Sequence, residues 1–531
     1  MNKKAYIEKL NRNKRRKWPY IIGLILLFIG LLLAFSVKWI YDTYGNITIY
    51  SILYLINSPM SGTDSTYIIS YIKQSLLPVL AIMVLIIFLT NNFYRKNIVL
   101  IVKKASKKMK ITLFPFMWLR TVALLIGIIT VGVSCTWGYY RTGLNIYIQN
   151  TLTVSNFYEE YYVDPATAKL EFPEKKRNLI YLSVESLEKT LESKENDGNK
   201  EPNHLPYCTQ LQNKYIAVEN EKGGQGYIVE GGGWTMGAMV SQMAGIPLLF
   251  VTNSMEFNED AQFLSGAYSI GEILKEQGYY NEYITGADKA FAGAGLFLTQ
   301  HGDYEILDIN AAIEQGYLPE GYHKNWGYED AKLFEILKQE ITEKYNDGIL
   351  FNIMASTLDT HSDEAYICEL CDPQIEEYHE KTYRCIDKQI GEFVEWFEQQ
   401  PFFEDTTLVI TGDHMSMSPT YFTDCDNYDR TVYSVFINAQ VENKKYTKTY
   451  TTLDMYPSTL AAMGVRIEGD RLGVGTNIFS NTPTYIEIFG KSDFNDRLAQ
   501  NNTFYKENLV KGNIEDVLGT NEDEDEDKDE D

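Results

Sequence analysis

Three long apolar stretches without a charged residue occur in the first part of the chain. They are Trp18–Val37, Gln74–Tyr94 and Thr121–Tyr140, and each has about the length that a helix needs to cross a bilayer core. A basic leader precedes the first stretch, but its apolar run is long for a signal sequence, so we interpret it as an uncleaved anchor. The pattern predicts a membrane anchor with three transmembrane helices in residues 1–141.

Basic residues flank these stretches unevenly. Met1–Trp18 holds eight Lys and Arg against one Glu, and Asn91–Met117 holds seven and no acidic residue, although the whole chain has a net charge of −24. Because basic loops stay in the cytoplasm, we expect Lys3–Lys17 and Arg95–Lys110 there. The chain after about Arg141 is then extracytoplasmic, and the protein is a multi-pass protein of the cell membrane with a cytoplasmic N-terminus.

A fourth apolar segment, Ile47–Gly62, lies between the first two stretches. It is short, and a fourth crossing would place the large C-terminal part in the cytoplasm against the charge pattern. An interfacial helix is therefore the expected structure.

After Arg177, apolar runs alternate with amphipathic helical patterns, which predicts an α/β domain with a mainly parallel central sheet. The expected helices are Ser269–Gly278, Tyr328–Tyr345 and Tyr383–Gln400. The expected strands are Asn178–Val184, Tyr280–Gly286, Gly348–Ser356, Thr406–Gly412 and Thr431–Ala439.

Three of these strands lead directly into polar residues. In parallel sheets the ligand lies beyond the carboxyl ends of the strands, so we expect the polar side chains to meet at one edge. Carboxylates and imidazoles together are typical of a metal site with mixed oxygen and nitrogen ligands. The residues brought to this edge are Glu185, Asp359, His361, Asp413 and His414.

Thr235 follows three glycines and opens a helical pattern that ends at Gly245 and Pro247. Taken alone, Thr235 is best explained as a helix cap. Beside a metal site its hydroxyl becomes a candidate nucleophile, because a bound cation favours the alkoxide and the helix start can hold a phosphate. Taken singly, Glu185 is explained as a solvated residue and His361 as a structural histidine. Their convergence at one sheet edge favours a catalytic site instead.

Five sequence blocks resemble the signature blocks of phosphoglycerol transferases, a family that includes lipoteichoic acid synthases within the alkaline phosphatase/sulfatase superfamily. The resemblance covers roughly residues 178–480 and is closest to the osmoregulated periplasmic glucan phosphoglycerol transferases. The blocks are "IYLSVESLE", "GWTMGAMVSQMAGIPL", "GADKAFAGAGLFLTQHG", "TLDTHS" and "ITGDHMSM".

The resemblance implies a role for each matching residue. Glu185, Asp413 and His414 would bind a divalent metal, which the resemblance gives as manganese with magnesium as the alternative, and Thr235 would be both ligand and nucleophile. His361 would contact the substrate phosphate or assist proton transfer. The other residues expected to line the substrate site are Asp288, Phe291, His301 and Asp359.

The implied reaction moves glycerol phosphate from phosphatidylglycerol of the outer leaflet, through a covalent Thr235 intermediate, to an acceptor. A glycan and polyglycerolphosphate both remain open as acceptor, and no nucleic-acid partner is expected. The alternatives are a phosphoethanolamine transferase of the same superfamily and a non-catalytic surface-binding protein. A sulfatase is not expected, because Thr235 is followed by Met-Gly-Ala rather than a C/S-x-P-x-R pattern.

The pattern divides the chain into an anchor (1–141), a linker (142–176), a catalytic domain (177–490) and a C-terminal extension (491–531). The extension ends in the acidic segment Asn521–Asp531, which we expect to be disordered. The motif "CELC" at Cys368–Cys371 has no second CxxC motif to accompany it, so a zinc ribbon is not expected. We expect either a local disulfide or two free thiols there. The pairing of Cys208, Cys368, Cys371, Cys385 and Cys425, the oligomeric state and the acceptor are left open.

Overall fold

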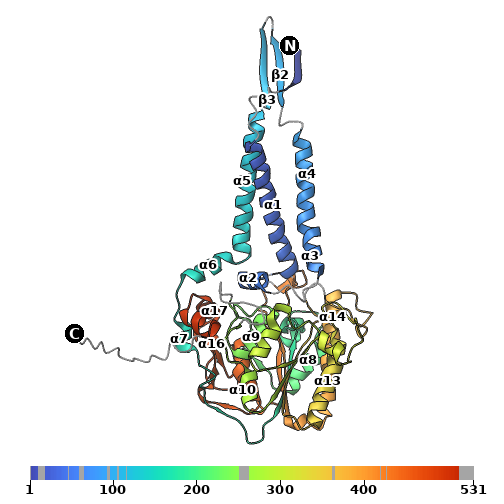
Figure 1. Cartoon of the computed structure of the whole chain (residues 1–531), viewed down its shortest axis with the longest axis vertical. Coiled ribbons are helices and arrows are strands. Elements are labelled where there is room, and N and C mark those ends of the chain that lie inside the picture. Colours follow the sequence, from blue (N-terminus) through green and yellow to red (C-terminus); the bar gives the residue numbers. More distant parts are fainter. Residues whose placement is uncertain are drawn as a thin grey trace, which may run out of the picture. The chain divides into compact units, whose positions relative to one another are not determined.

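The computed structural model divides into two compact units, which are described separately (Figure 1). The first comprises Met1–Ile49 and Asp64–Tyr147 with the short segment Ser418–Thr420, and the second holds Tyr50–Thr63, Ile148–Met417 and Tyr421–Asp531. The predicted acidic tail lies outside the described residues. These are 2–9, 18–45, 47–58, 65–91, 96–104, 107–114, 116–249, 262–361, 365–418, 420–425 and 427–512.

The first unit contains three helices that are long and apolar enough to cross a membrane, over Trp18–Tyr44, Tyr67–Thr90 and Trp118–Arg141. In the second of them one π-helical turn links two α-helical segments. The elements are α1 (Trp18–Tyr44), α3 (Ser65–Tyr71), the π-helical turn Ile72–Leu76, α4 (Leu77–Asn91) and α5 (Phe116–Arg141).

Helices α1 and α5 approach each other through glycines. A Cβ atom on Gly23 would lie 2.5 Å from the backbone of Ala123, and one on Gly127 would lie 2.5 Å from the carbonyl oxygen of Gly23. Small residues of this kind allow two apolar helices to pack backbone against backbone, which favours their association in lipid.

The described parts of the two basic segments of the first unit form a sheet. β1 (Asn2–Lys9), β2 (Lys96–Lys104) and β3 (Lys107–Phe114) form an antiparallel sheet in the order β1-β2-β3. Asn2 lies opposite Lys103 and Lys9 opposite Lys96, so the leader and the loop are paired along the whole of β1.

The second unit is built on a six-stranded sheet in the order β12-β11-β5-β10-β8-β9, in which only β12 runs antiparallel to its neighbour. The predicted α/β fold with a mainly parallel sheet is confirmed. The strands are β5 (Asn178–Val184), β8 (Tyr280–Thr285), β9 (Glu305–Leu307), β10 (Phe351–Ser356), β11 (Thr406–Gly412) and β12 (Ser434–Ile437).

Helices cover both faces of this sheet. Ile180 and Leu182 of β5 share a buried core with residues of α8, α12, α13 and α14. The next side chain along β5, Tyr181, points to the other face and bonds to Gln242 of α9. The helices of the unit are α2 (Ile49–Asn57), α6 (Leu144–Leu152), α7 (Phe157–Tyr161), α8 (Pro206–Lys214), α9 (Thr235–Ala244), α10 (Ile270–Glu276), α11 (Ala294–Gln300), α12 (Ile309–Glu314), α13 (Asp330–Asn346), α14 (Tyr378–Glu398), α15 (Met455–Ala462), α16 (Tyr485–Phe489) and α17 (Lys491–Ala499); the unit boundaries fall within α2 and α6.

Short two-stranded pairings connect the outer loops of the unit. They are β6 (Val218–Glu219) with β13 (Tyr446–Thr447), β7 (Gly226–Tyr227) with β14 (Tyr450–Thr451), β4 (Leu170–Glu171) with β15 (Arg466–Ile467), and β16 (Arg471–Leu472) with β17 (Gly475–Thr476).

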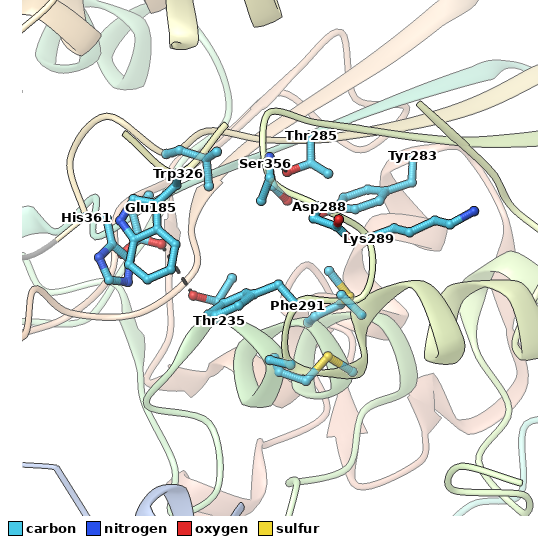
Figure 2. Close-up of a pocket in the computed structure, with 16 residues that line it drawn as sticks. Glu185, Thr235, Tyr283, Thr285, Asp288, Lys289, Phe291, Trp326, Ser356 and His361 are labelled. Atoms are coloured by element: carbon cyan, nitrogen blue, oxygen red, sulfur yellow. Dashed lines mark hydrogen bonds between the residues drawn. The ribbon is translucent and has the colours of Figure 1, made fainter. Parts of the chain in front are cut away.

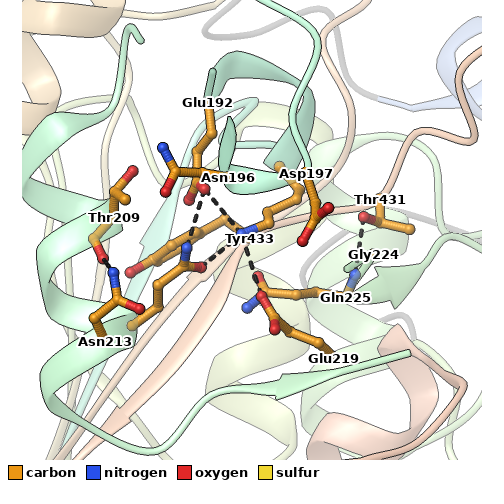
Figure 3. A network of polar contacts seen from close by, with 12 residues as sticks. Glu192, Asn196, Asp197, Thr209, Asn213, Glu219, Gly224, Gln225, Thr431 and Tyr433 are labelled. Atoms are coloured by element: carbon orange, nitrogen blue, oxygen red, sulfur yellow. Dashed lines mark hydrogen bonds and ion pairs between the residues drawn. The ribbon is translucent and has the colours of Figure 1, made fainter. Parts of the chain in front are cut away.

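A buried polar network fixes the chain that follows β5 (Figure 3). Lys189, only 1% exposed, donates to Glu192 Oε2 and Gln212 Oε1, each 2.8 Å away, and lies 3.3 Å from Glu219 Oε1. A buried ammonium is tolerated only where such partners satisfy it. The network therefore holds the segment just after the first strand end in one conformation.

Candidate metal centre and active site

The ends of β5 and β11 are tied together by hydrogen bonds. Asp413 N donates to the carbonyl of Val184, and Ser186 N donates to Asp413 Oδ1 over 2.8 Å. Ser186 adopts the left-handed region with φ 56°, which is rare for a residue other than glycine and turns the chain sharply after Glu185. The strand pairing and this turn together bring Glu185 next to Asp413.

Gly412, the last residue of β11, is required by close packing. A Cβ atom at this position would lie 1.9 Å from the carbonyl oxygen of Leu187. Any other residue would push the two strand ends apart, so the glycine before Asp413 keeps the site closed.

The structure places Thr235 at the first turn of α9, with its hydroxyl facing the strand ends. Its Oγ1 lies 3.4 Å from Glu185 Oε2, to which it donates, and 3.4 Å from His414 Nε2. The N-cap position of α9 is Trp234, which makes no capping bond through its side chain. Helix capping therefore does not account for the orientation of the threonine hydroxyl.

His414 presents one ring nitrogen to the cluster. Its Nδ1 lies 2.9 Å from the carbonyl oxygen of Met415, which fixes the proton on Nδ1 and leaves the Nε2 lone pair free to bind a metal. Nε2 lies 3.3 Å from Asp413 Oδ2 and 3.5 Å from Glu185 Oε1. Potential ligand atoms of the three residues all lie within 4.8 Å of one another.

The buried carboxylates of this cluster favour the binding of a cation. Glu185, Asp413 and His414 are each at most 3% exposed. Burial, and then repulsion by Glu185, raises the pKa of Asp413 to about 7. Burial opposes the charged form of His414, but Asp413 and Glu185 outweigh it and raise the pKa of the imidazole. A divalent ion would offset both carboxylates, and two carboxylates with one imidazole suit manganese or magnesium.

A pocket opens beside Thr235 and is lined by Glu185, Asp288, Phe291 and His361 among others (Figure 2). Its wall includes three rings in contact: the Phe291 and Trp326 centroids are 5.3 Å apart in an edge-to-face pair, and those of Trp326 and His361 are 4.9 Å apart in a tilted pair. These rings would shield a reacting group beside Thr235 from bulk water on that side.

His361 and Asp359 lie on the loop after β10, but only His361 lines the pocket. Burial lowers the pKa of His361 to about 4, and its Nδ1 is buried without a hydrogen-bond partner among the described residues. Asp359 instead accepts from the backbone N–H of Asp330, whose carboxylate accepts from the N–H groups of Leu358 and Asp359. Asp359 thus holds the loop in shape rather than facing the pocket.

Asp288 and His301 also have structural contacts. Asp288 lines the pocket, but its carboxylate accepts from Ala290 N and Asn310 Nδ2 and so shapes the loop that carries Phe291. His301 is outside the residues that line the pocket: its Nε2 lies 2.8 Å from the carbonyl of Phe263 and its Nδ1 3.3 Å from Glu272. The catalytic and substrate-binding roles assigned from the sequence remain predictions.

Sequence reasoning missed several residues that build the site. Gln242 bridges α9 to the end of β11, and Trp326 completes the aromatic wall. Tyr54 of α2 packs its ring on Trp234, 5.8 Å between centroids, and donates to the carbonyl of Ala292 over 2.6 Å. The sequence predicted an interfacial helix in the short apolar segment Ile47–Gly62, but nothing there linked it to residues far along the chain.

Residues 232–465, which include Thr235 at the helix start as well as Asp413 and His414 of the carboxylate–imidazole cluster, match the family model described as Sulfatase. This match agrees with the resemblance to the alkaline phosphatase/sulfatase superfamily that the sequence blocks carry. The curated relatives that the chain matches include proteins named phosphoglycerol transferase I. One from Xanthomonas euvesicatoria pv. vesicatoria is 29% identical over 55% of this chain and 40% of its own length, and one from Salmonella typhi is 26% identical over 63% of this chain and 40% of its own length.

The chain therefore spans about 40% of the length of these relatives. Among solved structures, the lipoteichoic acid synthase LtaP from Listeria monocytogenes aligns with 59% of this chain and 79% of its own, at 16% identity and a TM-score of 0.47. That likeness concerns the fold alone.

Proposed function

We propose that the protein is a membrane-bound, divalent-metal-dependent phosphoglycerol transferase that uses Thr235 as its nucleophile. The observation that carries the proposal is the position of the Thr235 hydroxyl, 3.4 Å from both Glu185 Oε2 and His414 Nε2, at a helix start that opens into a pocket. The similarity to proteins named phosphoglycerol transferase I supports the same reaction class.

In the proposed reaction the oxygen of Thr235 attacks the phosphorus of phosphatidylglycerol. A bond forms between Oγ1 and phosphorus, the bond from phosphorus to the diacylglycerol oxygen breaks, and the proton of Thr235 ends on the departing diacylglycerol. In the second displacement an acceptor hydroxyl of a cell-envelope glycan or polyglycerolphosphate takes the glycerol phosphate and returns a proton to Thr235.

Each residue of the site has a part in this scheme. Glu185 accepts the hydroxyl hydrogen of Thr235 and so orients Oγ1 towards the pocket. The free backbone N–H groups at the start of α9 face the place where phosphate charge accumulates. His361, neutral because burial lowers its pKa, lies where it can donate to or accept from the substrate phosphate.

Glu185, Asp413, His414 and Thr235 would hold the metal ion, which we propose to be manganese or magnesium. When bound, such an ion lowers the pKa of a coordinated hydroxyl and polarises a phosphoryl oxygen.

The apolar helices and their basic flanks support the membrane arrangement that we propose. We place the N-terminus and the basic sheet β1-β2-β3 in the cytoplasm and the domain that holds the Sulfatase match outside the cell membrane, where it faces lipid headgroups of the outer leaflet. A lipid donor suits an enzyme that is itself anchored to the bilayer.

The test uses the full chain in detergent micelles with fluorescent phosphatidylglycerol and Mn²⁺, and measures diacylglycerol release. Release is expected from the wild type and not from Thr235→Ala, and Thr235→Ser should retain part of it because the serine keeps the hydroxyl. Mass spectrometry of trapped enzyme should show a glycerophosphate adduct, and the adduct should map to the peptide that contains Thr235.

Three results would overturn the proposal. Undiminished release by Thr235→Ala would remove the nucleophile, and release from phosphatidylethanolamine alone would make the protein a phosphoethanolamine transferase. Absence of turnover of either lipid by folded, metal-loaded protein would favour a non-catalytic binding protein.

A further inference from the structure

Three cysteines from two separate segments converge outside the active site. Cys368 and Cys371 lie on the loop after His361, and Cys385 lies in the second turn of α14. The Cys368 Sγ atom is 3.7 Å from that of Cys371 and 3.5 Å from that of Cys385, and all three sulfur atoms lie within 4.8 Å of one another. Each residue is buried, at 6–8% exposed.

These spacings match those of thiolates around one tetrahedral ion. Sulfur ligands at about 2.3 Å from zinc are about 3.8 Å apart in a tetrahedron. A disulfide would use two of the three sulfur atoms and would leave the third thiol buried beside it without a bonding partner. Three thiols within reach of a single centre instead fit a soft metal ion, which binds sulfur in preference to oxygen.

A fourth position next to the sulfur atoms has a candidate occupant. Gln389, one turn after Cys385 on α14, is 6% exposed, and its Nε2 lies 3.5 Å from Cys385 Sγ. Its Oε1 is buried without a hydrogen-bond partner among the described residues. The amide can therefore either donate to a sulfur ligand or, turned over, offer its oxygen to the ion.

The surroundings also provide access. Cys368 and Gln389 line an open depression between α13 and α14, so an ion can enter from solvent without unfolding of the domain. This cluster is chemically distinct from the oxygen-rich cluster at Thr235, since no residue is shared between the two.

We propose that Cys368, Cys371 and Cys385 form a thiolate site for a zinc ion, separate from the active-site metal. Binding converts three thiols to thiolates and releases three protons, with no oxidant or reductant needed. The fourth ligand is Gln389 or a water molecule.

Occupancy of this site would act on the loop that carries His361. Tyr366 N donates to the carbonyl of Asp359 over 2.7 Å, and Tyr366 packs against the cysteines. The ion would thus fasten Tyr366, and through it Asp359, onto α14. The metal site itself does not depend on the proposed transferase activity.

The experiment measures zinc by mass spectrometry in the full chain, purified from zinc-supplemented cells and dialysed against metal-free buffer. We expect about one zinc ion per chain in the wild type and less than about a tenth of that in Cys371→Ser and Cys385→Ser. Cys425→Ser, which changes a buried cysteine outside the cluster, is the matched control and should retain the zinc. Asp413→Ala should retain it as well, which separates this site from the active-site ion.

Zinc-edge X-ray absorption on the wild type gives a second measurement that does not depend on variants. Sulfur scatterers at about 2.3 Å are expected. Zinc bound only by oxygen and nitrogen, equal zinc in all variants, or an intact mass that shows a disulfide between two of the three cysteines would each overturn the proposal.

Discussion

Gln242 Nε2 donates to the backbone carbonyl of Asp413 over a distance of 3.2 Å. The same nitrogen donates to the carbonyl of Gly412, and Oε1 accepts from Tyr181 OH of β5. One buried amide therefore links the helix that begins at Thr235 to both strands that end beside Glu185 and Asp413. This side chain thereby fixes the position of the Thr235 hydroxyl relative to the carboxylate–imidazole cluster.

The first prediction concerns this amide. Gln242→Leu removes the bonds that Gln242 makes to the carbonyl of Asp413 and to the Tyr181 hydroxyl, whereas the carbonyl of Gly412 still accepts from Thr411 Oγ1. We therefore expect a loss of about 1–3 kcal/mol in the free energy of unfolding. We also expect kcat to fall by about 10²-fold, because a shift of about 1 Å between catalytic groups costs that much. Urea denaturation and lipid turnover check the two effects. Tyr181→Phe is the matched control, since it removes one bond and leaves Gln242 attached to β11; equal kcat in both variants would contradict the bridging role.

Tyr54 offers a second test, because α2 reaches the active-site helix through it. Tyr54→Phe removes the bond to Ala292 and should cost about 1 kcal/mol. Tyr54→Ala also removes the packing on Trp234 and Phe263 and should cost about 3–5 kcal/mol. Thermal unfolding measures both, and the peptide around Trp234 should exchange amide hydrogens faster in the alanine variant. Ile56→Ala, at a position 74% exposed on the same helix, should change neither the unfolding temperature nor the rate of amide exchange.

The third prediction is a dependence of stability on pH that arises at Glu282. Burial, followed by repulsion from Glu340, raises the pKa of Glu282 to about 8 from its ordinary 4.5. Between these values the folded protein binds more protons than the unfolded chain, so the free energy of unfolding falls as pH rises. Denaturation at several pH values from 5 to 9 measures the slope. Glu282→Gln should flatten it, whereas Glu335→Gln, at an exposed residue, should not.

Metal removal gives the fourth prediction. Chelation with EDTA should abolish diacylglycerol release, and added Mn²⁺ should restore it in the wild type but not in Asp413→Ala. Because the pKa of Asp413 without metal is raised to about 7, protons compete for the site, and the affinity for Mn²⁺ should weaken as pH falls below that value. Manganese at about 100 times its Kd should stabilise the folded chain by about 2.7 kcal/mol. A melting temperature that does not respond to Mn²⁺ would contradict a bound ion.

The central strands were predictable because they are buried on both faces. β5 and β11 occupy the residues expected from the sequence, since each reads as a continuous apolar run. β9 was missed because it has only three residues at the edge of the sheet. The basic sheet was missed for a different reason: its lysines were interpreted only as a cytoplasmic flank, and charge alone does not reveal strand pairing.

The convergence of Glu185, Thr235, Asp413 and His414 followed from topology, since parallel strands end at one edge. Contacts between distant segments left no such signal. Cys385 looks like one more residue on the buried face of an amphipathic helix, and only the folded loop brings Cys368 and Cys371 to it. Likewise, the glutamine at 242 is unremarkable in sequence until its amide meets the end of β11.

The pairing of β1 with β2 constrains how many times the chain between them can cross a membrane. Two strands can form a sheet only when both lie on the same side of a lipid bilayer, so an even number of crossings must separate Lys9 from Lys96. In the proposed membrane arrangement the helices Trp18–Tyr44 and Tyr67–Thr90 supply that number. A third crossing by α2 would place the two paired strands in different compartments, so the basic sheet supports the proposed arrangement over one with a fourth crossing.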